Sequence, residues 1–340
     1  MRTMVDLTTY IENKVERYGM TVNDINSEIY RLLDKPFTKL TAGFSNFFLY
    51  LVSRIEEYIS RITVYLKGIY DFDGKVFIET KAFLIKVDSI LLNHCKQDKL
   101  DLLSLAILSN DLSKLQTLSP YFLTFIQKRM DNNFNYEINL RQIFETTSNQ
   151  IDDKICSTYP ISLSYHLSNW LNVKWMEKKP LKEPRKFIQE LGHFLKTTLG
   201  DISKVNYTVG VTLAYRSFRE VNRMLAEVFT QQVKTFNIVD IAIIDVELEY
   251  LCSIADDDFF QLDRLKETLS QMTQFVQLFL DFNPQAYLDT EKRQAKFYSL
   301  GPQFLLRVLP KYRKTVIQGL PVVRKRECKA ATDYIQEKMV

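Results

Sequence analysis

The chain has 340 residues, of which 46% are apolar and 13% aromatic, and it contains only 9 Gly and 9 Pro. This composition excludes a disordered chain, and the shortage of turn residues favours long helices over a β-sandwich. The length exceeds that of a typical single domain, so we expect two sub-domains. The net charge is only +4, so we expect surface charges of both signs.

Helical spacing of apolar residues covers most of the first half of the chain. It predicts helices over 4–18, 22–33, 37–67, 76–95, 101–118, 120–130 and 137–155. Ser119 and Pro120 predict an N-cap and a first-turn proline for the helix that follows them. Turn residues interrupt the pattern at 71–74 and 130–135, and a further helix is expected over 161–173.

The clearest internal boundary is the stretch KWMEKKPLKEP at 174–184, which holds two prolines among charged residues. Such a stretch is typical of a linker. We therefore predict an N-terminal helical sub-domain over 1–173, a linker over 174–184, and a C-terminal helical sub-domain with a basic tail over 185–340.

Helices are expected next over 185–199 and 202–230, but the stretch at 236–251 is ambiguous. FNIVDIAIIDVELEYL is rich in β-branched residues, which favour strands, and VELEYL alternates between polar and apolar residues. The sequence offers no strand of similar quality to pair with it, and an unpaired strand leaves its backbone groups unsatisfied. We therefore predict a buried helix that is apolar on nearly all sides.

The segment after this helix has the most regular pattern of the chain. Its apolar residues recur at alternating steps of three and four, as in a heptad seam: Leu262, Leu265, Leu269, Met272, Val276 and Phe279. This spacing predicts one helix of an antiparallel bundle. The Asn-Pro pair at 283–284 ends it, and shorter helices follow over 286–293 and 302–312. We expect Tyr287 and Leu288 to cover the end of the bundle.

Positive charge is concentrated near the end of the chain. Between 311 and 329 a single acid, Glu327, stands against seven cations: Lys311, Arg313, Lys314, Arg324, Lys325, Arg326 and Lys329. Such a stretch is commonly the solvated end of a helix, but it can also contact anionic lipid or an acidic partner. Elsewhere acids and bases are interleaved without a reader motif, so we expect no nucleic-acid partner.

The residues that carry chemistry do not form a catalytic set. His94, His166 and His193 stand apart from one another, without further ligands at metal-site spacing. The aspartates at 256–258 lack the ligand pattern of a calcium loop and are better explained as acids at a helix start. Phosphate-binding loops and nucleophile elbows are absent from the sequence. We therefore expect no enzyme activity, no metal and no cofactor.

Cellular location is indicated by three features. The four cysteines lie far apart, as in a reduced cytosolic protein, and the N-terminal residues do not form a secretion signal. The most apolar window, 43–52, is too short to span a membrane. The sequence therefore predicts a cytoplasmic helical protein that acts as an interaction scaffold.

The segment QFVQLFLDFNPQAYLDTEKRQAKFYSLGPQFLLRVLPKYR at 274–313 resembles a signature of the exocyst subunit Sec15. In that family a Leu- and Phe-rich helix end is followed by D-W-x-x-Y-L and then by K-Y-x-x-V-x-P. The residues here are, in order, Asp281, Phe282, Tyr287, Leu288, Lys296, Phe297, Tyr298, Leu300 and Pro302. The stretches at 183–199 and 233–255 are similar to further family segments, as are GMTVND and KPFTKL near the start of the chain.

The resemblance implies an all-α fold of two stacked antiparallel helical bundles in an elongated rod, formed by the C-terminal portion of a longer subunit. It implies a non-enzymatic tethering subunit, peripheral at secretory vesicles and plasma-membrane exocytic sites. Its partners would be other exocyst subunits and a GTP-loaded Rab GTPase bound by the C-terminal lobe. Two alternatives remain: a scaffold subunit of a related tethering complex that contacts only sister subunits, and a membrane-surface module that uses the basic tail.

The predicted Rab-binding residues lie within 236–251, where the family has Asn-x-Asp at the positions of Asp245 and Glu247. Because this stretch has more apolar residues than one buried stripe requires, Ile238, Ile241 and Ile244 are candidate anchors. Asp245 and Glu247 would be acids at the rim of the contact. The alternative is that all of these residues pack between two other helices of the bundle.

Overall fold

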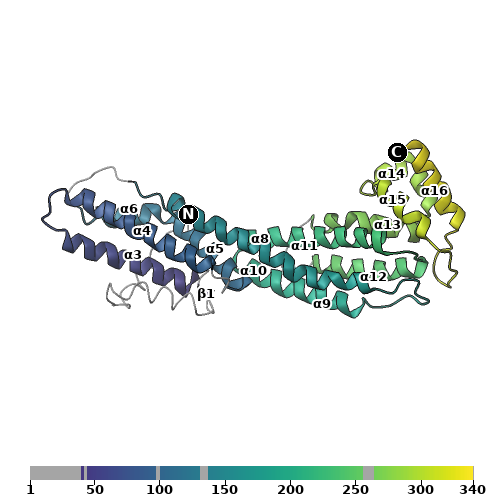
Figure 1. The fold of residues 1–340 in the computed structure, drawn as a ribbon, viewed down its shortest axis with the longest axis horizontal. Helices are drawn as coiled ribbons and strands as arrows, with labels where there is room; N and C mark the ends of the chain where they lie inside the picture. The colour runs from purple at the N-terminus through teal and green to yellow at the C-terminus, as the bar shows by residue number, and fades with distance from the viewer. Residues whose placement is uncertain (1–39, 42–43, 97–99, 131–136, 256–263, 340) are drawn as a thin grey trace. The chain divides into compact units, whose positions relative to one another are not determined.

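The computed structural model describes the following residues: 40–41, 44–96, 100–130, 137–255 and 264–339 (Figure 1). Over these residues the chain forms helices joined by loops, together with one antiparallel pair of two-residue strands, β1 (Leu40–Thr41) and β2 (Phe44–Ser45), and an isolated bridge between Phe236 and Tyr312. The all-α prediction is therefore confirmed. The helices predicted at 4–18 and 22–33, and the aspartates at 256–258, lie outside the described residues.

The chain divides into two compact units, Met1–Thr158 and Tyr159–Val340. The stretch predicted as a linker, 174–184, lies inside the second of them. The sub-domains predicted over 1–173 and 185–340, and their stacking into a rod, stay predictions.

The first unit is a bundle of helices. In chain order these are α3 (Asn46–Tyr65), α4 (Phe72–Lys96), α5 (Leu102–Thr117), α6 (Ser119–Gln127), α7 (Leu140–Ile143) and the beginning of α8 (Glu145–Leu167). The Ser45 hydroxyl caps α3 by accepting from the Phe48 N–H at 3.1 Å, and it donates to the carboxylate of Asp111 on α5. Burial raises the pKa of Asp111 to about 6. This polar contact joins α3 to α5 inside an apolar core.

The start of α6 differs from the prediction. Ser119 is the first residue of the helix instead of its N-cap, while Pro120 lies in the first turn as expected. The Ser119 hydroxyl donates to the Gln116 carbonyl at 3.3 Å and accepts from the Leu140 N–H at 3.1 Å. It therefore connects the start of α6 to α7.

Helix α8 joins two helices that were predicted separately, at 137–155 and 161–173, and it contains Pro160. A proline removes one helical hydrogen bond and disfavours continuation. After Pro160, Leu163 and Leu167 are buried four residues apart, so the apolar side of the helix continues past the proline. Packing of that side stabilises the helix through the proline.

The second unit begins with the end of α8 and the 3-10 turn η2 (Ser168–Asn172). It continues with α9 (Lys186–Phe194), the π-helical turn η3 (Leu195–Leu199), α10 (Gly200–Val205), α11 (Tyr207–Glu227), the π-helical turn η4 (Val228–Gln232) and α12 (Ile238–Ala255). The remaining elements are η5 (Lys266–Leu269), α13 (Ser270–Leu280), η6 (Pro284–Leu288), α14 (Thr290–Lys296), α15 (Pro302–Val308), η7 (Leu309–Lys311) and α16 (Lys325–Lys338). Helix α12 packs against α13 and α9, as can be followed in Figure 1. The helix prediction for 236–251 is therefore confirmed over α12.

The heptad seam is confirmed over its described part. Leu262 lies outside the described residues, and the other members are fully buried: Leu265, Leu269, Met272, Val276 and Phe279. Aromatic rings extend this core toward the end of the chain, with centroids 5.2–6.1 Å apart among Phe229, Phe236, Phe275, Phe279 and Tyr312. Edge-to-face contacts of this kind add to the energy of burial.

The Asn-Pro break is a turn that closes the bundle. Asn283 caps η6 by accepting from the Gln285 N–H at 2.9 Å, and Pro284 occupies the first turn. Tyr287 is buried, and its hydroxyl donates to the Leu300 carbonyl at 2.7 Å. The expectation that Tyr287 covers the bundle end is therefore supported, while Leu288 is half-buried.

Two glycines allow close helix crossings in the second unit. A Cβ on Gly192 of α9 would lie 2.5 Å from the ring of Tyr250 on α12. A Cβ on Gly210 of α11 would lie 2.8 Å from the Cα and 2.1 Å from the Oγ of Ser203 on α10. The second contact is with backbone, so a side-chain rotation does not relieve it.

We expect Gly210→Ala to lower the free energy of unfolding by about 1–3 kcal/mol, because the added methyl group overpacks this crossing. The loss would oppose the gain of about 1 kcal/mol that Gly→Ala gives in an open helix. Gly301→Ala is a steric control, since nothing lies within 4 Å of its new Cβ; it should cost less, about 0.5–1 kcal/mol, because Gly301 is the N-cap of α15, where Ala is less favourable than Gly. Urea unfolding followed by circular dichroism measures both variants. Equal stability of the two would contradict the close packing of α10 on α11.

Candidate partner-binding surface

Helix α12 begins at a buried polar junction. The Asn237 side chain accepts from the N–H groups of Val239 and Asp240 at 2.8 and 3.1 Å. In return, the Asp240 carboxylate accepts from the N–H groups of Asn237 (2.8 Å), Met176 (2.9 Å) and Glu177 (3.1 Å). Burial raises the pKa of Asp240, and these three hydrogen bonds oppose the rise. The junction fixes the stretch predicted as a linker to the first turn of α12.

A buried ion pair joins the middle of α12 to the start of α9. Arg185 donates from Nε and Nη2 to the two carboxylate oxygens of Glu247 at 2.5 and 2.7 Å. The Glu247 side chain is 1% exposed and that of Arg185 19%. The guanidinium also faces the rings of Trp175 and Phe187 at 5.8 and 5.3 Å. Glu247 is thus held by a two-point, charge-assisted contact inside the chain.

The predicted apolar anchors of the Rab contact are used in core packing. Ile238, Ile241 and Ile244 are each 0% exposed, and Glu247 is buried as well. The expectation that part of this apolar excess is left over for a partner is therefore corrected: neighbouring elements cover these side chains. A contact through them would require them to leave the core. Of the five predicted residues, Asp245 is the one that keeps part of its surface exposed.

The solvent side of α12 carries Asp245, Val246, Glu249, Tyr250 and Ser253, which we call the outer face of α12. Glu249 and Ser253 are exposed, and the other three are half-buried. These positions lie along one stripe of the helix, and Ile244 and Glu247 lie toward its other side. The outer face is therefore the part of α12 that a partner can reach without unpacking the core.

The outer face is acidic, and Asp281, exposed just after α13, adds to it. The pKa of Asp245 is raised to about 6, chiefly by burial and then by the negative charges of Glu249 and Asp281. Within the described part of the chain, Asp245 forms no ion pair. Its charge is thus partly desolvated and uncompensated, unlike that of Glu247.

Sequence reasoning missed Glu249 and Asp281 as neighbours of Asp245. Glu249 is four residues further along the same helix, so its proximity follows once the stretch is taken as a helix. Asp281 is on another element, and only the packing of α13 on α12 brings it near. The sequence alone carries no signal for that contact.

Lys311, predicted among the lipid-contacting cations, has a structural role instead. Its Nζ donates to the carbonyls of Phe229 and Thr230, both at 2.8 Å, at the π-helical end of α11. Cations at this end of a helix satisfy free carbonyls and oppose the helix dipole. Burial lowers the pKa of Lys311. The remaining predicted cations are exposed: Arg313, Lys314, Arg324, Lys325, Arg326 and Lys329.

Helix α16 was not predicted from the sequence. The N–H of Arg324 donates to the Glu327 carboxylate at 2.6 Å, which closes the first turn. Cys328, Ala331 and Ile335 are buried at spacings of three and four. This pattern is a helical signal, but it is sparse among charged residues.

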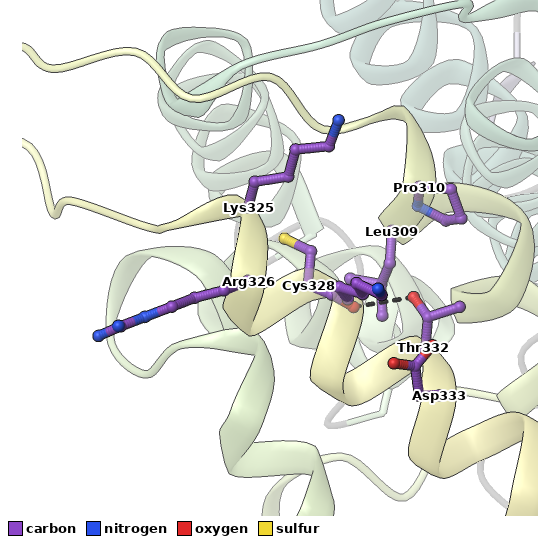
Figure 2. Close-up of a pocket in the computed structure, with 8 residues that line it drawn as sticks. Leu309, Pro310, Lys325, Arg326, Cys328, Thr332 and Asp333 are labelled. Atoms are coloured by element: carbon purple, nitrogen blue, oxygen red, sulfur yellow. Dashed lines mark hydrogen bonds between the residues drawn. The ribbon is translucent and has the colours of Figure 1, made fainter.

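A pocket of about 530 Å³ lies between η7 and α16. Leu309 and Pro310 form one side, and the other lining residues belong to α16: Lys325, Arg326, Cys328, Lys329, Thr332 and Asp333. Figure 2 shows that Arg326 extends away from Leu309 and Pro310, while the Thr332 hydroxyl donates to the Cys328 carbonyl at 2.8 Å. The pocket thus combines an apolar side with cations from one helix.

The titratable groups give no indication of catalysis. Burial raises the pKa of the Cys95 and Cys328 thiols to about 11 and about 12, so both stay protonated at neutral pH. Within the described ranges, His, Cys, Asp and Glu do not gather in groups of three or more that could hold a metal ion. Among the described helices, none is long and apolar enough to cross a membrane.

Known proteins share the sequence pattern and the fold of this chain. The family model for the exocyst complex subunit Sec15 C-terminal region matches residues 10–311. A solved structure titled "Structure of Myo2-GTD in complex with Mmr1" is similar with a TM-score of 0.52 and 14% identity, covering 94% of this chain and 86% of that chain. At this identity the likeness shows the fold alone. The search of curated proteins gave no match.

We expect Arg185→Ala to lower the free energy of unfolding by about 3 kcal/mol, because it leaves the Glu247 carboxylate buried without a counter-charge. The double variant Arg185→Met/Glu247→Leu removes both charges and should recover much of that loss. Chemical unfolding of the single and double variants measures the difference. A double variant that is no more stable than Arg185→Ala would contradict this assignment of the pair.

Asp245 gives a pH-dependent prediction. Its pKa rises on folding from 3.8 to about 6, so the folded chain binds the proton more tightly than the unfolded chain. Through this group, stability is lost as the pH rises across that interval and stays lower above it. Near pH 3.8 the free energy of unfolding of Asp245→Asn should match that of the wild type. At neutral pH the variant should be more stable by on the order of 1 kcal/mol, a value reduced for solvent screening. Unfolding measured over a pH series tests this, and a variant less stable at neutral pH would contradict it.

Proposed function

The chain belongs to the Sec15 C-terminal family of exocyst subunits, and from this premise we propose that it tethers secretory vesicles by binding a GTP-loaded Rab GTPase. The family assigns it an exocyst role, with other exocyst subunits as partners. We place the protein peripherally at vesicles and plasma-membrane exocytic sites, acting without catalysis. The Rab would bind the second unit, on the outer face of α12.

The main support for this location is the uncompensated charge of Asp245. The junction at Asp240 and the ion pair at Glu247 hold α12 in a fixed position, so the outer face is presented by a rigid helix. Asp245 lies half-buried beside Glu249 and Asp281, where a cation from a partner would relieve the repulsion among the acids. Val246 and Tyr250 supply partly exposed apolar surface next to them.

Nucleotide dependence follows from the structure of the partner class. The switch regions of a GTPase are ordered by contacts to the γ-phosphate and are released on hydrolysis. A helix face that contacts ordered switches therefore binds the GTP form more tightly. The fold is compatible with such a role by analogy, since the similar solved structure is itself in complex with a partner, Mmr1.

The 340-residue chain is immobilised and exposed to a panel of Rabs. We expect it to retain one matching Rab in the GTP-loaded form, and to retain at least about 10-fold less of the same Rab in the GDP-loaded form. Asp245→Arg and Glu249→Arg should each weaken the retained complex by roughly 10-fold or more, because they place like charges against the partner's cations. Titration by surface plasmon resonance with both nucleotide forms gives the affinities.

Glu183→Arg is the control, since it makes the same charge change at an exposed acid of the same unit that is not one of the outer-face residues. It should bind as the wild type does. Equal retention of both nucleotide forms across the panel would overturn the effector proposal and favour a scaffold subunit that contacts only sister subunits. If Asp245→Arg loses its helical circular dichroism, Asp245 is a core residue and this location for the contact is wrong.

A further inference from the structure

The end of the chain forms a second surface with the opposite charge. Residues 313–323 connect η7 to α16 as a loop whose two ends are attached to the core. The buried Tyr312 donates from its hydroxyl to the carbonyl of the buried Val323 at 3.2 Å. At the first end, the Phe236 N–H donates to the Lys311 carbonyl at 3.3 Å, and the Arg313 N–H donates to the Phe236 carbonyl at 2.7 Å. The base of the loop is thus fixed.

The tip of this loop exposes aliphatic side chains. The Leu320 N–H donates to the Ile317 carbonyl at 3.2 Å, and Gly319 has a φ of +85°, a conformation that favours glycine, so the chain reverses here. Val316 and Val322, on the two sides of the turn, are 66% and 49% exposed. Two aliphatic side chains are thus held in solvent on a loop with a fixed base.

Cations surround these valines in the sequence. Arg313 and Lys314 precede Val316, and Arg324, Lys325 and Arg326 follow Val322. The acid of the segment, Glu327, is occupied by the Arg324 N–H in the first turn of α16. One negative charge therefore stands against these five cations.

The pocket beside α16 offers a place for a charged headgroup. Its volume of about 530 Å³ is in the range of small-molecule sites. Lys325 and Lys329 line it one turn apart, and Arg326 extends outward from the same turn (Figure 2). Asp333 is the acid among its lining residues, and it opposes an anion there.

We propose that the loop 313–323 and the first turn of α16 form a membrane-surface site for anionic phospholipid. The cations Lys325, Arg326 and Lys329 bind the phosphate headgroups, and Val316 and Val322 enter the apolar layer beneath them. This combination of basic and exposed aliphatic residues is what an interfacial membrane contact requires. An acidic peptide that binds through charge alone would use the cations and not the two valines.

The test is co-sedimentation of the 340-residue chain with phosphatidylcholine vesicles that contain about 20% phosphatidylserine, against pure phosphatidylcholine vesicles. The chain should bind the anionic vesicles only. Lys325→Ala/Arg326→Ala/Lys329→Ala should weaken binding by about 100-fold. Val316→Ser/Val322→Ser should weaken it by about 10-fold with every cation kept. Asp333→Asn should strengthen it several-fold, since it removes the opposing charge from the pocket.

The matched control is Lys178→Ala/Lys179→Ala/Lys182→Ala, which removes the same charge from three exposed lysines of the same unit. It should bind nearly as the wild type does. Three results would overturn the proposal: equal binding to neutral vesicles, equal losses in the control and the α16 variant, or no effect of the valine changes. Binding of a soluble glutamate-rich peptide without binding of vesicles would assign the site to an acidic protein instead. No GTPase is present in this assay, so its outcome is independent of the Rab proposal.

Discussion

Two buried carboxylates on α12, those of Asp240 and Glu247, determine how the second unit is assembled. A carboxylate is costly to bury unless charges or N–H groups surround it, and here both are satisfied by the segment that precedes α9. Asp240 binds the backbone at 176–177, and Glu247 binds Arg185. Because these contacts hold the start of α9 against α12, Gly192 can approach Tyr250 closely enough to exclude a side chain. The rigid helix with one free face follows from this arrangement.

The elements of the second unit were predictable because their patterns are strong. The heptad spacing predicted α13, and the absence of a second strand for pairing predicted that 236–251 is helical. The orientation of α12 was not predictable, because a helix that is apolar on nearly all sides gives no direction to its exposed stripe. Glu247 illustrates the difficulty: its charge suggests exposure, but its counter-charge is 62 residues away in the sequence. Only the packed structure shows that the acid is paired.

The basic segment shows a second limit of sequence reasoning. A count of charges treats seven cations alike, whereas their environments differ: Lys311 closes a helix end, and the others remain in solvent. Helix α16 escaped prediction because three buried residues, Cys328, Ala331 and Ile335, are spaced among many charges. Its packing forms the pocket beside η7, so the feature that gives the cations a shared site was also hidden.

The two proposed contacts depend on different physical interactions. Asp245 lies two residues from Glu247, which places the two acids on opposite sides of α12, one paired and the other not. A partner's cation gains the most binding energy beside an acid that is partly desolvated and has no counter-charge. Folding of the chain has already removed part of the water from such an acid, so binding does not have to. The cations near α16 are solvated, so their attraction to lipid depends on charge density and on the valines that enter the apolar layer. An anionic membrane attracts the basic end and repels the acidic face of α12. Electrostatics therefore favour an orientation that turns the basic end toward an anionic membrane and the acidic face of α12 away from it.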